Sequence, residues 1–421
     1  MSGPLGGVAT GAVPGPVAEV RYGVLGLPLR TPLRHHAVDT TELTEVFLRV
    51  RLADGTTGWA ETRGNGAYAT HHTASSITAA LTALPPLTAP SWADPLALAA
   101  TLATHCPPAA ALLDIACRDA RARARGLPLW ATLREAGGSG PAPGQGAGAV
   151  PVPLVPPLVP PLVPPPPLPT HAPVGFGTPE EGAALAAEAV AAGFRRVKIR
   201  VGGDPERDRA RVRAIRDAVD RAAGPGAVVL AADANGGWDV PTARAAARWL
   251  AGLGTAWLEQ PVPPGDLAAL AAVRADSPVP VWADESVRDA ASVHAVADAG
   301  AADGVHLKLE KAGTVAALAE AVGAARARGL AVGLGQMDCG RLGCATTAHL
   351  AAGLGIETAE LWGCAHLARD VTEGIALHRG AVHLPAAPGL GVRVDVDPRT
   401  LTPVAGAPAP PSPTPARTPS P

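Results

Sequence analysis

Short apolar runs that each end on a charged residue recur through the middle of this chain. Four of these runs close on Asp233, Glu259, Asp284 and Lys308, at successive intervals of 26, 25 and 24 residues. Buried parallel strands read as continuous apolar runs, and this spacing accommodates one strand and one return helix. The sequence therefore predicts an α/β fold built on a (β/α) barrel, in which the charged residues meet at the carboxyl ends of the strands.

Three of the predicted strand ends are acidic. The carboxylates of Asp233, Glu259 and Asp284 would converge on one face of the barrel, where so much negative charge cannot be buried without a cation. Hard carboxylate oxygens without a Cys or His partner select a hard divalent ion, which indicates Mg²⁺, with Mn²⁺ as an alternative. The competing interpretation is that each acid is merely solvated or paired with an arginine.

Lysines lie in the runs on either side of these acids, Lys198 before them and Lys308 after them. Beside a divalent cation and a second cationic side chain, the charged form of a lysine is disfavoured, so the lysine can act as a base. A metal ion on a substrate carboxylate, with a lysine at the α-carbon, predicts abstraction of the α-proton and an enediolate intermediate.

Five motifs together resemble the enolase superfamily and, within it, the mandelate racemase/muconate lactonizing enzyme family. They read Lys198-Ile199-Arg200, Asp233-Ala234-Asn235, Glu259-Gln260-Pro261, Asp284-Glu285-Ser286 and Lys308-Leu309-Glu310-Lys311-Ala312-Gly313. The resemblance implies a modified (β/α)7β barrel of the TIM type with an N-terminal α+β capping domain. It also implies a Mg²⁺ ion held by Asp233, Glu259 and Asp284, with Asn235 and Glu285 behind these ligands, and a lysine base.

Arg200 departs from the family pattern, which places a second catalytic lysine at this position. A guanidinium is effectively always protonated and makes a poor base, although it can hold a carboxylate or stabilise developing negative charge. Racemisation through two bases needs one base on each face of the α-carbon, and Lys308 is the unstrained candidate. Three outcomes stay open: Arg200 serves as an unusual acid or base, the reaction is one-sided, or catalysis has been lost.

The rest of the chain divides around the barrel motifs. We expect a disordered tail over 1–17, a capping domain over 18–136, the barrel over 137–366, a segment returning to the capping domain over 367–401 and a disordered tail over 402–421. A Pro-rich insertion over 151–173 would follow a first barrel strand at 149–153, because dense proline removes backbone donors and favours polyproline II. Its open interpretations are a function-neutral disordered insertion, a lid and a docking segment.

Two polar loops of the predicted capping domain, 23–36 and 62–72, correspond by the resemblance to the loops that choose the substrate. From them we select His36 and Tyr68 as candidate substrate-binding residues. A polar loop can also be merely solvated, so these two residues are expectations.

Asp338 and Trp362 follow the last two predicted barrel strands. A carboxylate beside an indole could hold a cationic nitrogen by charge and by cation–π contact, which favours an amino acid or N-alkylated amino acid as substrate. The alternative is that Trp362 belongs to the core and that Asp338 pairs with Arg341.

Composition and charge exclude several classes of partner. The formal net charge of −2 gives no reason to expect nucleic acid or an anionic membrane. Residues 1–17 show neither a basic segment nor a sustained apolar run, so we expect no signal peptide and no transmembrane helix. Five cysteines without Cys-x-x-Cys spacing fit reduced thiols and a cytoplasmic protein. The predicted partners are a small-molecule carboxylate and, by analogy with the family, further copies in a homo-oligomer.

Isomerisation by a racemase, epimerase or cycloisomerase is favoured, because the resembled family is dominated by it. Lys308 would be the principal base, and Lys198 and Arg200 would supply positive charge near the carboxylate and the reacting carbon. The alternatives are a dehydratase acting on a hydroxy acid, which needs one base and an acid for the leaving group, and a non-catalytic metal-binding relative.

Overall fold

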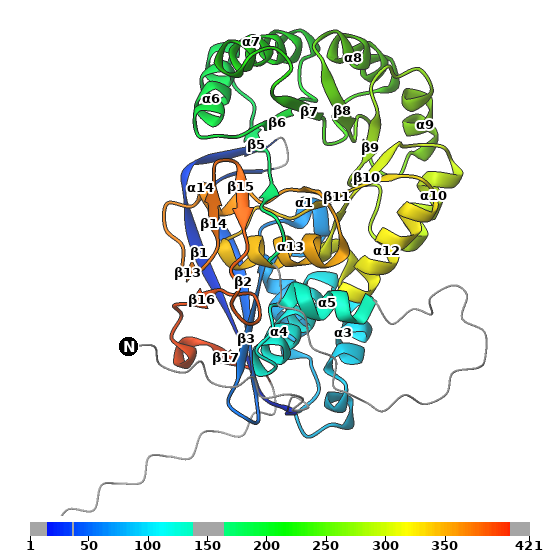
Figure 1. Ribbon diagram of the computed structural model, residues 1–421. Coiled ribbons are helices and arrows are strands. Elements are labelled where there is room, and N and C mark those ends of the chain that lie inside the picture. The colour runs from blue at the N-terminus through cyan, green and yellow to red at the C-terminus, as the bar shows by residue number, and fades with distance from the viewer. Residues whose placement is uncertain (1–14, 36–37, 138–163, 405–421) are drawn as a thin grey trace, which may run out of the picture.

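The computed structural model describes residues 15–35, 38–137 and 164–404. An antiparallel sheet with helices is formed mainly by the N-terminal third, and a curled parallel sheet with helices on its outer side is formed by the remainder (Figure 1). The two parts are the predicted capping domain and the predicted barrel, so the expected fold class is confirmed.

The capping domain begins with two long strands, β1 (Val17–His35) and β2 (Val38–Leu52), which pair antiparallel. Strand β3 (Thr57–Arg63) pairs with β2 through the predicted turn at Gly55, whose φ of 89° favours glycine. The helices that follow are α1 (Ala67–Thr70), α2 (Ala74–Thr82), η1 (Pro90–Ala93), α3 (Pro95–Ala103), α4 (Pro107–Ala124) and α5 (Leu129–Gly137). Helix α4 packs so closely on β3 that a side chain at position 58 would clash. A Cβ at Gly58 would lie 2.1 Å from the Ala116 carbonyl oxygen.

The barrel sheet contains eight parallel strands in chain order. They are β5 (Ala172–Val174), β6 (Arg196–Arg200), β7 (Val229–Asp233), β8 (Thr255–Glu259), β9 (Val281–Ala283), β10 (Gly304–Lys308), β11 (Ala331–Gly335) and β12 (Thr358–Ala359). Their order explains the regular spacing of charged residues, since each strand pairs with the next one along the chain.

Return helices connect these strands and cover the outer side of the sheet (Figure 1). They are α6 (Pro179–Ala191), α7 (Pro205–Ala223), α8 (Val240–Gly252), α9 (Leu267–Ala275), α10 (Ala290–Asp298), the short α11 (Leu309–Ala312), α12 (Val315–Ala327) and α13 (Arg341–Leu354). Each of the helices α6 to α10 follows a Thr or Asp whose side chain accepts a backbone N–H of the first turn. These caps fix where each helix starts, and therefore where the preceding strand-end loop lies.

Strands β5 and β12 are the two edges of the barrel sheet. Contacts between residues that flank these edges include a hydrogen bond from the Leu361 N–H to Thr170 Oγ1 at 2.8 Å and the approach of His171 Nε2 to Glu360 Oε1 at 3.1 Å. These contacts leave a seam between β5 and β12, and this seam opens on the site described below.

The first strand of the barrel sheet is β5, whereas the strand predicted at 149–153 lies outside the described residues. Residues 168–173, which we assigned to the Pro-rich insertion, contain β4 (Leu168–Pro169) and the first two residues of β5 instead. A strand as proline-rich as β5 is tolerated because it lies at a sheet edge. The Pro-rich run therefore precedes the first barrel strand in the chain and does not belong to a βα loop, which removes the reason for expecting a lid.

The C-terminal segment contains α14 (Gly363–His366), β13 (Thr372–Glu373), β14 (Ala376–His378), β15 (Ala381–His383), β16 (Arg393–Val394), η2 (Pro398–Thr400) and β17 (Thr402–Pro403). The segment predicted to return to the capping domain does contact it, since the Leu129 N–H donates to the Gly389 carbonyl at 2.8 Å. The strand that joins the capping sheet is β17, which pairs with β1. Residues 402–403 and Val17, all assigned to disordered tails, therefore belong to that sheet.

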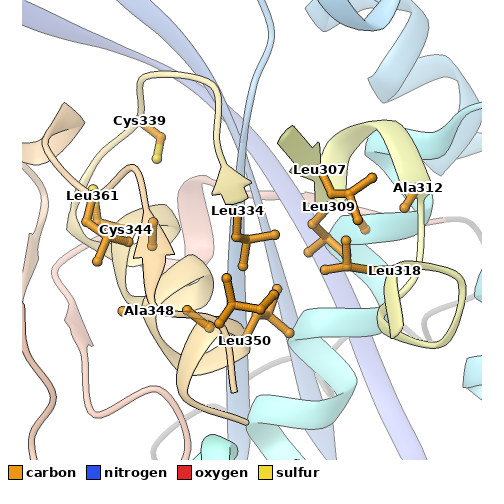
Figure 2. Close-up of a cluster of buried hydrophobic side chains, with 14 of the residues drawn as sticks. Leu307, Leu309, Ala312, Leu318, Leu334, Cys339, Cys344, Ala348, Leu350 and Leu361 are labelled. Atoms are coloured by element: carbon orange, nitrogen blue, oxygen red, sulfur yellow. The ribbon is translucent and has the colours of Figure 1, made fainter. Parts of the chain in front are cut away.

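The core of the barrel lies between the sheet and its outer helices. Figure 2 shows one part of it, where Leu307 of β10, Leu334 of β11, Leu318 of α12 and Leu350 of α13 gather, each at 1% exposure or less. The five cysteines are free and buried, as expected for reduced thiols. Among the described residues, no helix combines the length and the apolar character that crossing a membrane requires.

Candidate active site

Successive strands deliver the three predicted acids to one edge of the barrel sheet. Asp233 ends β7, Glu259 ends β8 and Asp284 follows β9, and each side chain is buried at 2% exposure or less. Gln260 fixes the last of these positions, because its Oε1 accepts the backbone N–H groups of Asp284 (3.1 Å) and Ser286 (3.2 Å). The structure thus places the three acids at or just after the ends of adjacent strands, whereas among the described residues their ligand atoms do not form a group that lies within 4.8 Å.

Lys308, the last residue of β10, donates a hydrogen bond to Asp284 Oδ2. A second lysine, Lys311 of α11, donates to Asp284 Oδ1 at 2.7 Å and to the Asp284 carbonyl at 2.6 Å. Burial alone would raise the pKa of Asp284, but the two ammonium groups hold it well below its usual range. Burial likewise acts to lower the pKa of Lys308, and the nearby carboxylates, Asp284 first, outweigh it and raise that pKa. Lys308 is therefore protonated while Asp284 faces it.

Space for the Lys308 side chain comes from a glycine on the next strand. Gly335 lies opposite Lys308 in the ladder between β10 and β11. A Cβ at Gly335 would stand 2.9 Å from Lys308 Cε and 3.1 Å from Glu360 Oε2, so a larger residue would displace the candidate base.

Lys198 of β6 lies among three carboxylates. Its Nζ is 2.6 Å from Glu259 Oε1, 2.6 Å from Glu360 Oε1 and 3.0 Å from Asp233 Oδ2. Burial acts to lower the pKa of Lys198, and the three carboxylates raise it well above its ordinary value. Lys198 is consequently a fixed positive charge in this arrangement.

Arg200, the position that departs from the family pattern, is held by the neighbouring strand. Its Nη1 donates to Asp233 Oδ2 at 3.1 Å and to Asn235 Oδ1. Although burial opposes the charged form, Asp233 raises the pKa of Arg200 above its usual value, which makes Arg200 an even poorer base. Its side chain is 28% exposed and borders the cavities described below.

Asn235 and Glu285 extend this chain of contacts. Asn235 Nδ2 donates to Glu285 Oε1 at 3.0 Å, while Glu285 Oε2 is buried without a hydrogen-bond partner. Burial, together with the charges of Asp284 and Asp233, raises the pKa of Glu285 to about 7. Glu285 is thus an acid whose second oxygen is free to bind a cation.

Three residues of this site were missed in the sequence. His306 Nδ1 lies 3.1 Å from Glu259 Oε1, and His171 Nε2 lies 3.1 Å from Glu360 Oε1. Burial acts to lower the pKa of His306, but Glu360 and Glu259 raise it. His306 stands two residues before Lys308 on β10, and this period of two, which places both on one side of a strand, was the available signal.

Two overlapping sets of residues could hold a divalent ion. Potential ligand atoms of Glu259, His306 and Glu360 lie within 4.8 Å of one another. The Lys198 ammonium, 2.6 Å from both of these glutamates, already supplies a positive charge to this set.

The other set is the predicted one of Asp233, Glu259 and Asp284. It offers only carboxylate oxygens, the donors that Mg²⁺ prefers. Asp233 and Asp284 line a cavity of about 50 Å³ together with Glu285, which has the unpartnered oxygen. By donor chemistry these residues suit a Mg²⁺ ion better than the set that contains His306, and in this structure Lys198, Lys308 and Lys311 hold their carboxylate oxygens.

A larger cavity of about 590 Å³ adjoins the small one. The two cavities share five lining residues, Lys198, Arg200, Gln336, Asp338 and Glu360. Tyr68 lines the small cavity and Trp362 the large one, whereas His36 lies outside the described residues. The charged strand ends thus lie beside a space large enough for a small-molecule ligand.

The surroundings of Asp338 and Trp362 contradict the alternative interpretation, in which Asp338 pairs with Arg341 and Trp362 belongs to the core. Arg341 pairs instead with Asp370, since its Nη1 donates to Asp370 Oδ2 at 3.1 Å. The same oxygen accepts the Arg341 backbone N–H at the start of α13. Asp338 Oδ2 instead lies 3.9 Å from Nη1 of the fully buried Arg63. Trp362 is partly exposed, with its ring 5.0 Å from that of His366. The pairing of Asp338 with Arg341 and the core position of Trp362 are therefore wrong.

Comparisons with known proteins agree with this geometry. Residues 181–398 match the family described as enolase C-terminal domain-like. A hydrophobic dipeptide epimerase from Citrifermentans bemidjiense is 30% identical over 352 residues, which cover 80% of this chain and 86% of that protein. The L-Lys-D/L-Arg epimerase of Methylococcus capsulatus is 28% identical over 390 residues, which cover 89% and 98%. The match to a hydrophobic dipeptide epimerase from a Flavobacteria bacterium (strain MS024-2A) is partial. It is 35% identical over 39% of this chain and spans 46%, about half, of the length of that protein.

Solved structures give the same result. A substrate-liganded complex of the L-Ala-D/L-Glu epimerase from Bacillus subtilis has a TM-score of 0.76 at 28% identity, covering 90% of this chain and 98% of that one. The dipeptide epimerase from Methylococcus capsulatus, complexed with Mg and the dipeptide L-Arg-D-Lys, has a TM-score of 0.73 at 27% identity, covering 90% and 99%. The chain therefore belongs to the mandelate racemase/muconate lactonizing enzyme family of the enolase superfamily.

Proposed function

We propose that this protein is a Mg²⁺-dependent isomerase that removes and returns the proton α to the carboxylate of an amino acid derivative. The proposal rests on the order of the strands in the barrel sheet. Lys308 lies on β10 and Lys198 and Arg200 lie on β6, and the three strands between β6 and β10 carry three buried carboxylates at their carboxyl ends. Names of the relatives support the substrate class, since they include dipeptide epimerases.

Asp233, Glu259 and Asp284 would hold the ion, with Glu285 and Asn235 behind them. When bound, Mg²⁺ would polarise the substrate carboxylate and stabilise the negative charge that develops as the α-proton leaves. The observation that supports this assignment is that Asp233 and Asp284 line the small cavity together with Glu285, whose Oε2 lacks a hydrogen-bond partner.

Lys308 would accept the α-proton. Asp284 is the largest of the charges that keep Lys308 protonated, so this lysine becomes a base once Asp284 is engaged elsewhere. Arg200 would hold the substrate carboxylate from the opposite side, and the protonated Lys198 would stabilise the developing charge and return a proton to that face of the α-carbon, as inversion requires. We assign no proton transfer to Arg200, because its contacts with Asp233 and Asn235 keep it charged.

Asp338, Trp362 and Tyr68 would contact the rest of the substrate, since all three line the two cavities. Asp338 is placed to accept a hydrogen bond from a substrate nitrogen, although its charge is already partly offset by Arg63 at 3.9 Å. A homo-oligomeric state and a cytoplasmic location stay predictions.

A dehydratase of a hydroxy acid is the second candidate. One observation favours it: of the two lysines that line the small cavity, Lys198 is held by three carboxylates and Lys308 by Asp284, so a single base faces the substrate. Elimination requires one base and an acid for the leaving group, whereas racemisation through two bases requires a base on each face.

The test is deuterium incorporation at the α-carbon in heavy water, with Mg²⁺ and a panel of dipeptides, N-acylamino acids, N-alkylamino acids and hydroxy acids. Incorporation with inversion supports the isomerase, and release of an unsaturated product supports the dehydratase. Absence of both reactions over the panel, together with unmeasurable Mg²⁺ binding by calorimetry, would leave the non-catalytic relative as the better description.

A further inference from the structure

The larger cavity continues away from the charged strand ends, through the seam between β5 and β12, to helix α6. Its walls along this path are formed by Pro173 and Phe176 beside β5, Ala184 and Leu185 on α6, and Trp362 after β12. Leu185 is 51% exposed, one of the large apolar side chains that the fold leaves open to solvent. An apolar channel therefore leads out from the charged end of the site.

The polar groups on this path are mostly occupied by the protein itself. Glu181 accepts the Thr178 N–H at 2.8 Å as part of its own helix cap, and His366 Nε2 lies 2.9 Å from Thr31 Oγ1. Among the buried side-chain atoms of the described lining residues, Gln336 Oε1 and His366 Nδ1 lack a partner. The walls can thus meet one or two polar groups of a ligand, and the charge that they present along the seam is the Glu181 carboxylate, which disfavours an anionic extension.

Phe176 is held rigidly enough to act as a wall. The guanidinium of Arg211 lies 5.2 Å from the centre of its ring, on the side of α7, and Arg211 is itself buried by its bonds to Asp208 and to the Arg200 carbonyl. Phe176 therefore packs against a buried arginine where it lines the cavity.

We propose that this site takes carboxylates that carry an extended, uncharged apolar arm, and that the arm lies along the seam against Phe176 and Leu185. The inference rests on the proposed function and deepens it by naming the class of substrate. It places the reacting carboxylate at Lys198 and Arg200, where the two cavities join, and the arm at the far end of the larger cavity.

Binding can test this independently of turnover. We would measure, by calorimetry with Mg²⁺ present, the affinity of N-acylalanines with linear acyl groups of increasing length, and of linear 2-amino acids of increasing side-chain length. Each methylene that enters the seam should tighten binding about fourfold, because burial of one methylene is worth about 0.8 kcal/mol. The series that shows this increase identifies whether the arm is attached at nitrogen or at the α-carbon.

Leu185→Asp should remove the increase with chain length while leaving the affinity of the shortest member unchanged. Val229→Asp is the matched control, since Val229 is also an exposed large apolar residue, 40% exposed, but lies at the amino end of β7 and does not line the cavity. Phe176→Ala provides a second variant, with a reduced increase, if Leu185→Asp does not fold.

Affinity that is independent of chain length in both series would overturn the proposal, as would an equal increase in the native protein and in both seam variants. Absence of binding by every member overturns it as well. Binding with the expected increase but without deuterium exchange would leave this inference standing and contradict the proposed function instead, so the two failures are distinguishable.

Discussion

The two sides of the active site present different cations to the substrate. On the side of β9 and β10, Lys308 and Lys311 share Asp284, and Lys308 borders the small cavity. On the side of β6 and β7, Arg200 binds Asp233 and Asn235, and borders both cavities. An ammonium can release its proton within an accessible pH range, whereas a guanidinium cannot.

This difference indicates that the two sides do different work. The lysine side is built for proton transfer, because Lys308 is kept charged mainly by one carboxylate that a metal ion would engage. The arginine side is built for fixed charge, because Lys198 and Arg200 are both tied to several acceptors. The predictions below test whether the asymmetry is real and how much of the chemistry depends on it.

Removal of the base on the lysine side should have the largest effect. We expect Lys308→Ala to lower α-proton exchange by about 10²- to 10⁴-fold, the contribution typical of a positioned general base. Lys308→Arg is the matched control, since it retains a positive charge beside Asp284 without a usable base. Exchange rates measured by mass spectrometry should fall similarly in both variants; recovery in Lys308→Arg would show that charge alone suffices.

Removal of a metal ligand on the arginine side should weaken Mg²⁺ binding. We expect Asp233→Asn to reduce the affinity by at least about 100-fold, because changes to groups behind a metal ligand already cost 10- to 100-fold. Glu360→Gln is the comparison, since Glu360 belongs to the competing set with Glu259 and His306. Calorimetry that shows a larger loss for Glu360→Gln would move the ion to that set.

Replacement of the guanidinium should reduce the asymmetry. We expect Arg200→Lys to raise exchange on the face away from Lys308 by roughly tenfold, a small part of what an evolved base contributes. The readout is deuterium incorporation into each enantiomer separately, in the native background and with Lys308→Ala. Equal incorporation into both enantiomers by the native protein, unchanged in Arg200→Lys, would show that Lys198 already delivers the proton on this face and that Arg200 does not limit it.

The strand-end acids and Lys308 could be predicted from the sequence, because parallel strands joined by return helices of similar length place their ends at a regular spacing. The first barrel strand could not be predicted, because β5 has only three residues and one of them is Pro173. The stretch 149–153, earlier in the Pro-rich region, resembles a strand more closely in sequence. Because β5 is so short, His171 beside it was not recognised as a site residue. Glu360 was missed for the same reason, since β12 has only two residues.

His306 was missed for a different reason. It lies within the apolar run Val305–Leu307, where a histidine reads as an interruption, and only its side chain's position inside the barrel, 2% exposed and facing Glu259, gives it a role. The partners of Asp338 were equally inaccessible, since Arg63 comes from the capping domain and Asp370 lies after the barrel. Contacts between distant segments depend on packing, which the local pattern does not encode.

The smallest predicted effect concerns Glu285, which joins the two sides through Asn235. Its pKa of about 7 lies above the ordinary glutamate value of 4.5, so the carboxyl is neutral below pH 7 and gains a negative charge above it. Mg²⁺ affinity should therefore rise between pH 6 and 8, approaching tenfold if the bound ion lowers that pKa by about one unit. Glu285→Gln, which resembles the protonated form at every pH, should flatten this rise in calorimetric titrations. An unchanged rise in the variant would assign the titration to another group and would confine the cation site to Asp233, Glu259 and Asp284.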